Sequence, residues 1–214
     1  MRRFFLVPLA FVAAAPLLGC APGVTDPASV AWEDGDILFQ VSHSGQAPAV
    51  ALASGSPITH TGLVSVDERT GAVTVVEAVQ PVREVPLATF LEHGSAWSAA
   101  RLRPETAAAL GPGWADKVLR VARKWKGLNY DARFEWSDSK IYCSELVWKA
   151  YARGVGLELV APQRVGELSL GNPVVQALIE KRTHGKGANL EEVIVTPGAL
   201  ADSPLLERFA GLPL

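Results

Sequence analysis

Three side chains of this 214-residue chain have the chemistry of a nucleophilic site: Cys143, His60 and Glu77. A thiol attacks a carbonyl carbon efficiently as the thiolate, so it needs a base or an imidazolium beside it. That partner in turn needs a third group to orient it. A cysteine, a histidine and a glutamate supply these three functions, provided that the fold brings together the elements that carry them.

Cys143 stands at the predicted start of a helix. The polar stretch 128–140 precedes it, and apolar residues recur at helical spacing from Leu146 to Tyr151. The amino terminus of a helix favours the thiolate, because its unpaired N–H groups and its dipole stabilise negative charge. Most free cysteines are small buried hydrophobic residues, but a position directly after a polar loop favours a reactive thiol.

His60 and Glu77 lie on two predicted strands that are joined by a tight polar turn. With the turn centred between Glu68 and Arg69, His60 lies directly opposite Glu77, at a Cβ separation of about 5 Å. A shift of the pairing by one residue would put the two side chains on opposite faces. Either residue alone is more often structural or solvent-facing, and it is their predicted pairing that indicates a site.

The other predicted elements alternate along the chain. Strands are predicted at 36–41, 59–66, 72–79 and 97–103, helices at 48–53, 86–92, 114–125 and from 143 onward, and a turn or helix at 104–110.

The amino-terminal segment has the pattern of an export signal. Two arginines precede an apolar run that is too short and too interrupted by proline to span a membrane well. The run ends at Leu17 to Cys20, which resembles a bacterial lipobox, in which the cysteine is acylated and becomes the mature amino terminus. Ala21 after it resembles an outer-membrane sorting signal, and an ordinary signal peptide with an incidental cysteine is the alternative. The predicted parts are a signal peptide at 1–19, a lipidated tether at 20–32 and one hydrolase domain at 33–214.

The charge balance and the histidine spacing exclude two classes of function. The chain has 20 basic and 22 acidic residues, and removal of the signal peptide would make it more acidic, so nothing indicates nucleic-acid binding. His43, His93 and His184 have no spacing that would build a zinc site with Cys143, and no H-E-x-x-H motif occurs. We therefore predict no metal and no cofactor.

Several motifs resemble the permuted papain-like amidases of the YiiX/YaeF type, which are relatives of the NlpC-like cysteine peptidases. They are Gly35–Gln40, the turn 42–46, Ser56–Val64, Tyr142–Val147 and Thr196–Pro204. The resemblance spans almost the whole mature chain, in order. It implies an α+β, circularly permuted papain-like (NlpC-like) fold, with an antiparallel sheet and the catalytic cysteine at a helix amino terminus. The histidine hairpin precedes the cysteine helix, which is the order that a permutation implies.

The resemblance also implies roles for individual residues. Cys143 matches the nucleophile, His60 the general base and acid, and Glu77 the residue that orients the imidazole. Three further residues match positions that would line the substrate pocket: Tyr142, Tyr130 and Gln46.

Together these observations predict a cysteine hydrolase of the bacterial cell envelope. A lipid at Cys20 would anchor it to the outer membrane, facing the periplasm, and it would cleave a peptide or N-acyl amide bond through a thioester. Its partners would be a small peptide, an N-acyl amide or a lipid as substrate, and the membrane.

Three alternatives stand beside this prediction. One is a catalytically idle lipoprotein that binds peptides or lipids in the same pocket. Another is a lipid acyltransferase or thioesterase, because the lecithin retinol acyltransferase branch resembles a related permuted design. The third is a serine hydrolase, because Ser137 and Lys140 fit S-x-x-K, although the partner motifs S-D-N and K-T-G are absent.

Overall fold

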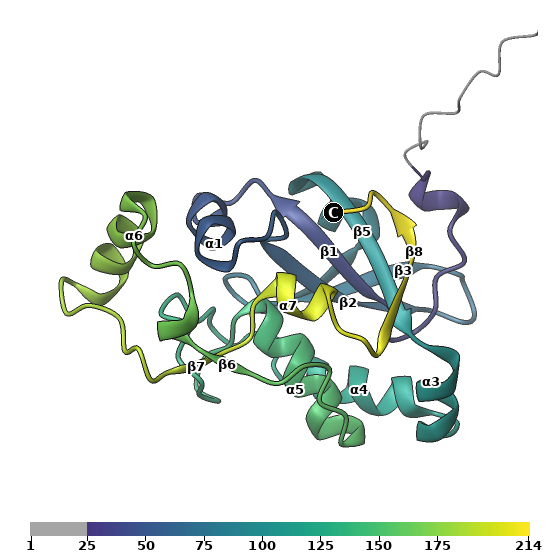
Figure 1. Ribbon diagram of the computed structural model, residues 1–214. Helices are drawn as coiled ribbons and strands as arrows, with labels where there is room; N and C mark the ends of the chain where they lie inside the picture. The colour runs from purple at the N-terminus through teal and green to yellow at the C-terminus, as the bar shows by residue number, and fades with distance from the viewer. Residues whose placement is uncertain (1–24) are drawn as a thin grey trace, which may run out of the picture.

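A six-stranded antiparallel sheet occupies the centre of the computed structural model, which describes residues 25–214 (Figure 1). Neighbouring strands follow the order β4-β3-β2-β1-β5-β8. The strands are β1 (Ile37–Ser42), β2 (His60–Val66), β3 (Val73–Glu77), β4 (Arg83–Pro86), β5 (Gly94–Leu102) and β8 (Leu206–Gly211). The mixture of this sheet with helices confirms the predicted α+β class.

Helices and a second, two-stranded sheet surround the central sheet. The helices are α1 (Ala47–Ser54), α2 (Leu87–Glu92), α3 (Pro104–Leu110), α4 (Trp114–Arg123), α5 (Cys143–Val155), α6 (Pro173–Thr183) and α7 (Pro197–Ala201). The small sheet pairs β6 (Gln163–Arg164) with β7 (Val193–Ile194). Short 3-10 turns lie at Pro27–Ser29 and Val165–Glu167.

Each face of the central sheet carries its own apolar core, because successive strand residues point to opposite faces. On one face Ile37, Phe39 and Leu63 pack with the buried sides of α4, α5 and α7. On the other face Leu38, Val64 and Val75 pack with Phe90 of α2. The sheet is therefore covered on both sides, and α5 is fixed against it along the helix's length.

Helix α5 carries the cysteine at its first residue. Its Leu146, Val147 and Ala150 are fully buried against the sheet and α4, which holds the helix in place. Gly156 ends the helix in a left-handed conformation, with a φ of 72°. The predicted helix start at Cys143 agrees with the structure.

The predicted register of the β2–β3 hairpin is wrong by two residues. Gly62, and not His60, lies directly opposite Glu77. The side chain of Asp67 accepts hydrogen bonds from the N–H groups of Arg69 and Thr70, and the backbone N–H of Asp67 donates to Ala72. These bonds close a longer loop than the tight turn that we expected, with Gly71 at a φ of 71°.

A shift of two residues preserves the face on which each side chain lies, because the period of a strand is two. His60 and Glu77 therefore share a face as diagonal neighbours, at a spacing that long side chains can bridge. The glycine opposite Glu77 puts no side chain between them.

The predictions for the amino-terminal segment lie outside the described residues. They comprise the signal peptide at 1–19, lipidation of Cys20, the sorting role of Ala21 and the start of the tether. Within residues 25–214, no helix has both the length and the apolar character needed to cross a bilayer.

Candidate active site

Cys143, His60 and Glu77 meet where α5 begins, β2 begins and β3 ends. Nε2 of His60 lies 2.6 Å from Oε2 of Glu77, and the Cys143 side chain is close enough to the imidazole to raise its pKa. Because Nε2 is bound to the carboxylate, Nδ1 is the ring nitrogen left for the thiol. The three residues are 4%, 9% and 1% exposed, respectively. The structure thus brings together the three residues that the sequence singled out.

The surroundings of His60 favour its protonated form. Burial lowers the pKa of the imidazole, but the interactions with Cys143 and Glu77 and their negative charges outweigh burial and raise the pKa to about 9. The ring of Phe90 stacks on the imidazole at 5.3 Å between centroids, which fixes the plane of the ring. A charged imidazole held in one orientation suits a thiolate partner.

Arg83 is a member of the site that the sequence analysis missed. Its Nε and Nη2 each lie 2.8 Å from Oε1 of Glu77, while the other carboxylate oxygen binds His60. Burial raises the pKa of Glu77, but its contacts with His60 and Arg83 outweigh burial and hold the pKa below its ordinary value. Arg83 lies directly opposite Glu77 in the β3–β4 pairing. An arginine opposite the glutamate on a neighbouring strand would have indicated this contact, but the sequence analysis predicts no strand at β4.

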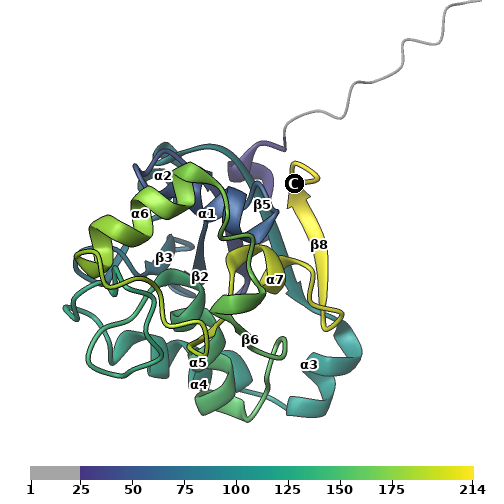
Figure 2. The same ribbon diagram turned by 60° about the vertical axis from the view of Figure 1, so that its left-hand side comes forward.

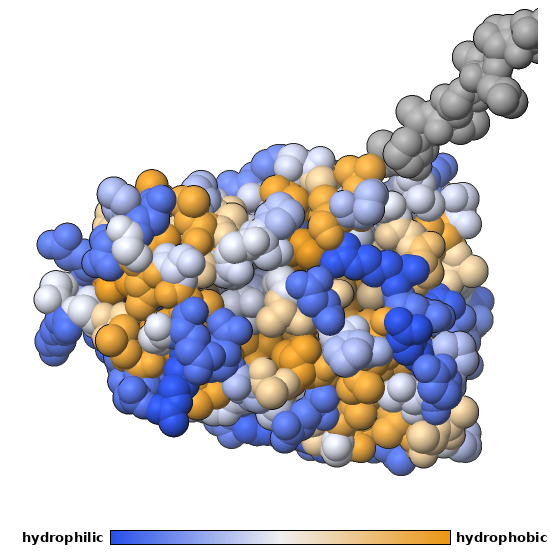
Figure 3. All heavy atoms as spheres, in the orientation of Figure 1, coloured by the Kyte–Doolittle hydropathy of each residue, from blue (hydrophilic) through white to orange (hydrophobic). Residues whose placement is uncertain are grey.

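A cavity of about 340 Å³ opens beside Cys143. Part of its wall comes from α1 and α6, which lie side by side in both views (Figures 1 and 2), and the rest from the loop before α5, the start of α5 and the segments that flank α6. The apolar side chains of the walls include Ala49, Val50, Ala53, Leu168, Leu170, Val175, Leu178 and Ile179. On the surface, apolar residues gather over α1 and α6, with hydrophilic residues around them (Figure 3).

Gln46 and Tyr130 line this cavity and are hydrogen-bonded to each other. Nε2 of Gln46 donates to the Tyr130 hydroxyl at 2.7 Å, and its Oε1 accepts from Nη2 of Arg182 at 3.1 Å. Burial raises the pKa of Tyr130, and the neighbouring Cys143 raises it further, so the phenol keeps its proton. Arg182, on α6, was not singled out from the sequence because no element had been predicted there.

Tyr142 lines the cavity, but its side chain is buried and also holds the start of α5 in place. Its side chain is 1% exposed, and its hydroxyl accepts a hydrogen bond from the N–H of Val195 at 3.2 Å. Its ring meets that of Phe134 edge to face. Tyr142 therefore ties the start of α5 to the segment between β7 and α7.

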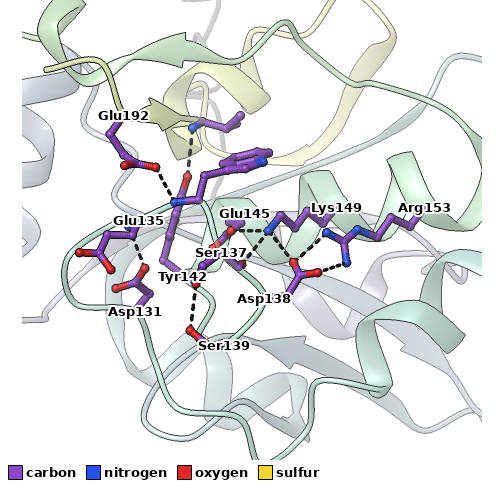
Figure 4. Close-up of polar contacts among 12 residues, drawn as sticks. Asp131, Glu135, Ser137, Asp138, Ser139, Tyr142, Glu145, Lys149, Arg153 and Glu192 are labelled. Atoms are coloured by element: carbon purple, nitrogen blue, oxygen red, sulfur yellow. Dashed lines mark hydrogen bonds and ion pairs between the residues drawn. The ribbon is translucent and has the colours of Figure 1, made fainter. Parts of the chain in front are cut away.

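A buried ion pair stabilises the first turns of α5 (Figure 4). Nζ of Lys149 lies 2.7 Å from Oε1 of Glu145 and 2.9 Å from Oδ1 of Asp138, and it donates to the Ser137 carbonyl at 2.7 Å. Burial raises the pKa of Glu145 to about 7, although Lys149 acts against it. Oε2 of Glu145 accepts from the N–H of Tyr142 at 3.2 Å. The pair thus connects the helix start that carries Cys143 to the loop before it.

The S-x-x-K motif of the sequence does not form a serine site. The Ser137 hydroxyl pairs with that of Ser139 at 3.1 Å, and Lys140 is exposed. The carbonyl of Ser137 binds Lys149, so this segment positions the loop. Within residues 25–214, no group of three or more histidine, cysteine or acidic side chains is arranged to hold a metal ion.

A buried cysteine, histidine and glutamate at the meeting of a helix start with an antiparallel sheet define a papain-like class of protein. Residues 31–209 match the family model described as "Permuted papain-like amidase enzyme, YaeF/YiiX, C92 family". Because the match covers most of the chain, the protein belongs to this family of permuted papain-like cysteine hydrolases.

Two relatives agree with the family. The uncharacterized protein YiiX of Escherichia coli K12 is 37% identical over 182 residues, which cover 84% of this chain and 88% of that protein. A crystal structure described as metalloprotein YiiX from Escherichia coli O157:H7 is 36% identical, with a TM-score of 0.77, and the match covers 84% of this chain and 97% of that one. The predicted family and permuted papain-like fold are confirmed.

The titration of His60 tests the electrostatics of the site. We expect an NMR titration of the His60 ring protons, assigned with a His60→Ala variant, to have its midpoint near 9 and not near 6.5. Glu77→Gln should move the midpoint to lower pH, because the carboxylate favours the imidazolium. Because the pKa is raised in the folded state, the pairing stabilises the fold below about pH 6.5 and loses this effect as pH rises through about 9. A midpoint near 6.5 that Glu77→Gln leaves in place would contradict this account.

The buried ion pair gives a prediction about stability. Lys149→Met should lower the free energy of unfolding by about 3–5 kcal/mol at pH 8, because it leaves Glu145 charged without its partner. The loss should shrink towards pH 5, where Glu145 takes up a proton in the folded state. Arg153→Gln is the matched control: it removes another α5 cation that binds Asp138, but its side chain is 44% exposed, so it should cost at most about 1 kcal/mol. Urea unfolding at both pH values measures these differences, and equal losses for the two variants would contradict the role of Lys149.

Proposed function

We propose that the protein is a cysteine amidase that cleaves an N-acyl or peptide amide bond through a Cys143–His60–Glu77 triad. The observation that carries the proposal is the position of His60, which binds the buried Glu77 and has the Cys143 side chain close enough to raise its pKa. Nucleophilic catalysis requires that arrangement.

In the first half of the proposed reaction, the Cys143 thiolate attacks the carbonyl carbon of the amide. The negative charge that develops on the carbonyl oxygen needs hydrogen-bond donors. The backbone N–H of Cys143 is one, because the first N–H groups of a helix have no partner within the helix. The hydroxyl of Tyr130 is another, since it accepts its bond from Gln46 and keeps its own proton for donation.

His60 transfers the protons in both halves of the reaction. The imidazolium donates its Nδ1 proton to the amine nitrogen as the C–N bond breaks, which releases the amine and leaves a thioester on Cys143. The now neutral His60 takes a proton from water, which attacks the thioester carbonyl. The acid leaves, and the thiolate–imidazolium pair is restored. Glu77 stays ionised throughout, since Arg83 and His60 lower its pKa.

The cavity supports an acyl chain or an apolar side chain as the acyl portion of the substrate. Its walls include apolar side chains of α1 and α6, and burial of each CH₂ group contributes about 0.8 kcal/mol to binding. The same thioester could pass to an acceptor alcohol, so an acyltransferase or thioesterase is the second candidate, and this apolar lining is the observation that favours it.

We also propose that the protein acts in the cell envelope, tethered through a lipid at Cys20. The proposal rests on the lipobox-like sequence at Leu17 to Cys20. The first described residues, beginning at Thr25, lie at the opposite end of the molecule from α6 (Figure 1). A tether at that end leaves the cavity between α1 and α6 open.

Turnover of a chromogenic amide tests the proposed reaction. We expect the protein to release p-nitroaniline from decanoyl p-nitroanilide, and Cys143→Ala to abolish this release. His60→Ala should lower kcat/KM by about 10²–10⁴-fold, as expected for general acid–base catalysis, and Glu77→Gln should lower it less.

His93→Ala, which removes an exposed histidine outside the cavity, is the control and should retain the full rate. Added hydroxylamine should capture the thioester as the hydroxamate. Full turnover by His60→Ala would refute the triad, and activity that survives Cys143→Ala would refute the thioester.

A further inference from the structure

A guanidinium group without an acidic partner lies in the wall of the cavity beside Cys143. Arg182, in the last turn of α6, donates from Nη1 to the carbonyl of Ala132 at 3.2 Å and from Nη2 to Oε1 of Gln46 at 3.1 Å. Both acceptors are neutral. Within residues 25–214 Arg182 forms no ion pair, although most of the partly buried cations of the chain do, among them Arg101 and Lys149. Three of its five N–H donors remain for a ligand.

Both acidic side chains of the cavity lining have ion-pair or hydrogen-bond partners. Glu135 pairs with Arg133 at 3.3 Å. The carboxylate of Glu192 accepts hydrogen bonds from the N–H of Trp136 and from Asn189. Lys186 lines the cavity and, like Arg182, adds a positive charge. Glu192, like Arg182, has only neutral partners. The charged side chains of the lining, Arg133, Arg182 and Lys186 against Glu135 and Glu192, therefore leave one net positive charge.

Arg182 is connected to the reacting centre through two side chains. Gln46 accepts from Arg182 through its oxygen and donates to Tyr130 through its nitrogen, and Tyr130 shares the cavity with Cys143. The charges of Cys143 and Arg182 both act on the Tyr130 phenol, one raising and the other lowering its pKa. A ligand that reaches Cys143 therefore lies within the electrostatic range of Arg182.

We propose that Arg182 selects substrates that carry an anionic oxygen group, a carboxylate or a phosphate, on the amine side of the scissile amide. The planar guanidinium matches both groups through paired hydrogen bonds. With the acyl portion proposed to lie along the apolar side chains of the walls, we assign the charged group to the portion that leaves as the amine. This inference rests on the proposed amidase function and names the substrate class of the same site.

Three probes with the same decanoyl amide test the selection: N-decanoylglycine, N-decanoyl-2-aminoethyl phosphate and the uncharged N-decanoylglycinamide. Each is added to the full chain with Cys20→Ser, and protection of Cys143 from iodoacetamide reports binding without any need for turnover. We expect at least one anionic probe to protect at a concentration about 10-fold lower than the glycinamide, the effect of one charge-assisted hydrogen-bonded contact. The tighter anionic probe identifies the group as carboxylate or phosphate.

Variants on α6 assign the preference to one residue. Arg182→Gln should abolish the preference for the anion, and Arg182→Lys, which keeps the charge, should retain part of it. Lys181→Gln makes the same change of charge at the preceding residue, which does not line the cavity, and should keep the whole preference. Melting temperatures of the variants report whether each one folds.

The outcomes separate this inference from the proposed function. Equal protection by charged and uncharged probes, or an equal loss in Lys181→Gln and Arg182→Gln, would overturn the role of Arg182 even if the amides are hydrolysed. An anion preference that depends on Arg182, in a protein that hydrolyses none of the three amides, would support the binding site and contradict the cleavage of N-acyl amides.

Discussion

The carboxylate of Glu77 is the constraint on which the rest of the site depends. It is 1% exposed and yet charged, which is costly unless each oxygen has a partner. One oxygen binds His60, and the other binds Arg83. Because Arg83 keeps Glu77 ionised, Glu77 can orient His60 and raise its pKa, and His60 can stabilise a thiolate on Cys143. The strands β4, β3 and β2 supply Arg83, Glu77 and His60 in turn, and the buried charge of Glu77 connects them to the thiol at the start of α5.

Much of this arrangement could be predicted from the sequence, because strand periodicity tolerates some errors of register. The hairpin was placed two residues out of register, but His60 and Glu77 remained on one face, as any even shift requires. The helix start at Cys143 was evident from the change from a polar loop to an apolar helical repeat. The family resemblance predicted the fold, which the family match and the YiiX structure confirm.

The residues that the sequence did not reveal lie on elements with weak local patterns. Arg83 is on the four-residue edge strand β4, and Arg182 is on α6, whose surface is mostly exposed and has little apolar periodicity. The edge strand β8 was missed for the same reason, since only Leu206 of its residues is buried. Their positions depend on contacts between segments far apart in the chain, such as that between Arg182 and Gln46. Such contacts leave no short-range signal.

The reactivity of the thiol tests the central claim most directly, since it requires no substrate. In the Cys20→Ser chain Cys143 is the single thiol, so the rate of alkylation by iodoacetamide at about pH 6, well below the ordinary thiol pKa of ~8.5, reports its thiolate fraction alone. The account predicts that His60→Ala slows this reaction by at least about 10-fold, while the two proteins react equally in urea. Equal rates in the folded proteins would contradict a thiolate–imidazolium pair and favour a site that only binds its ligand.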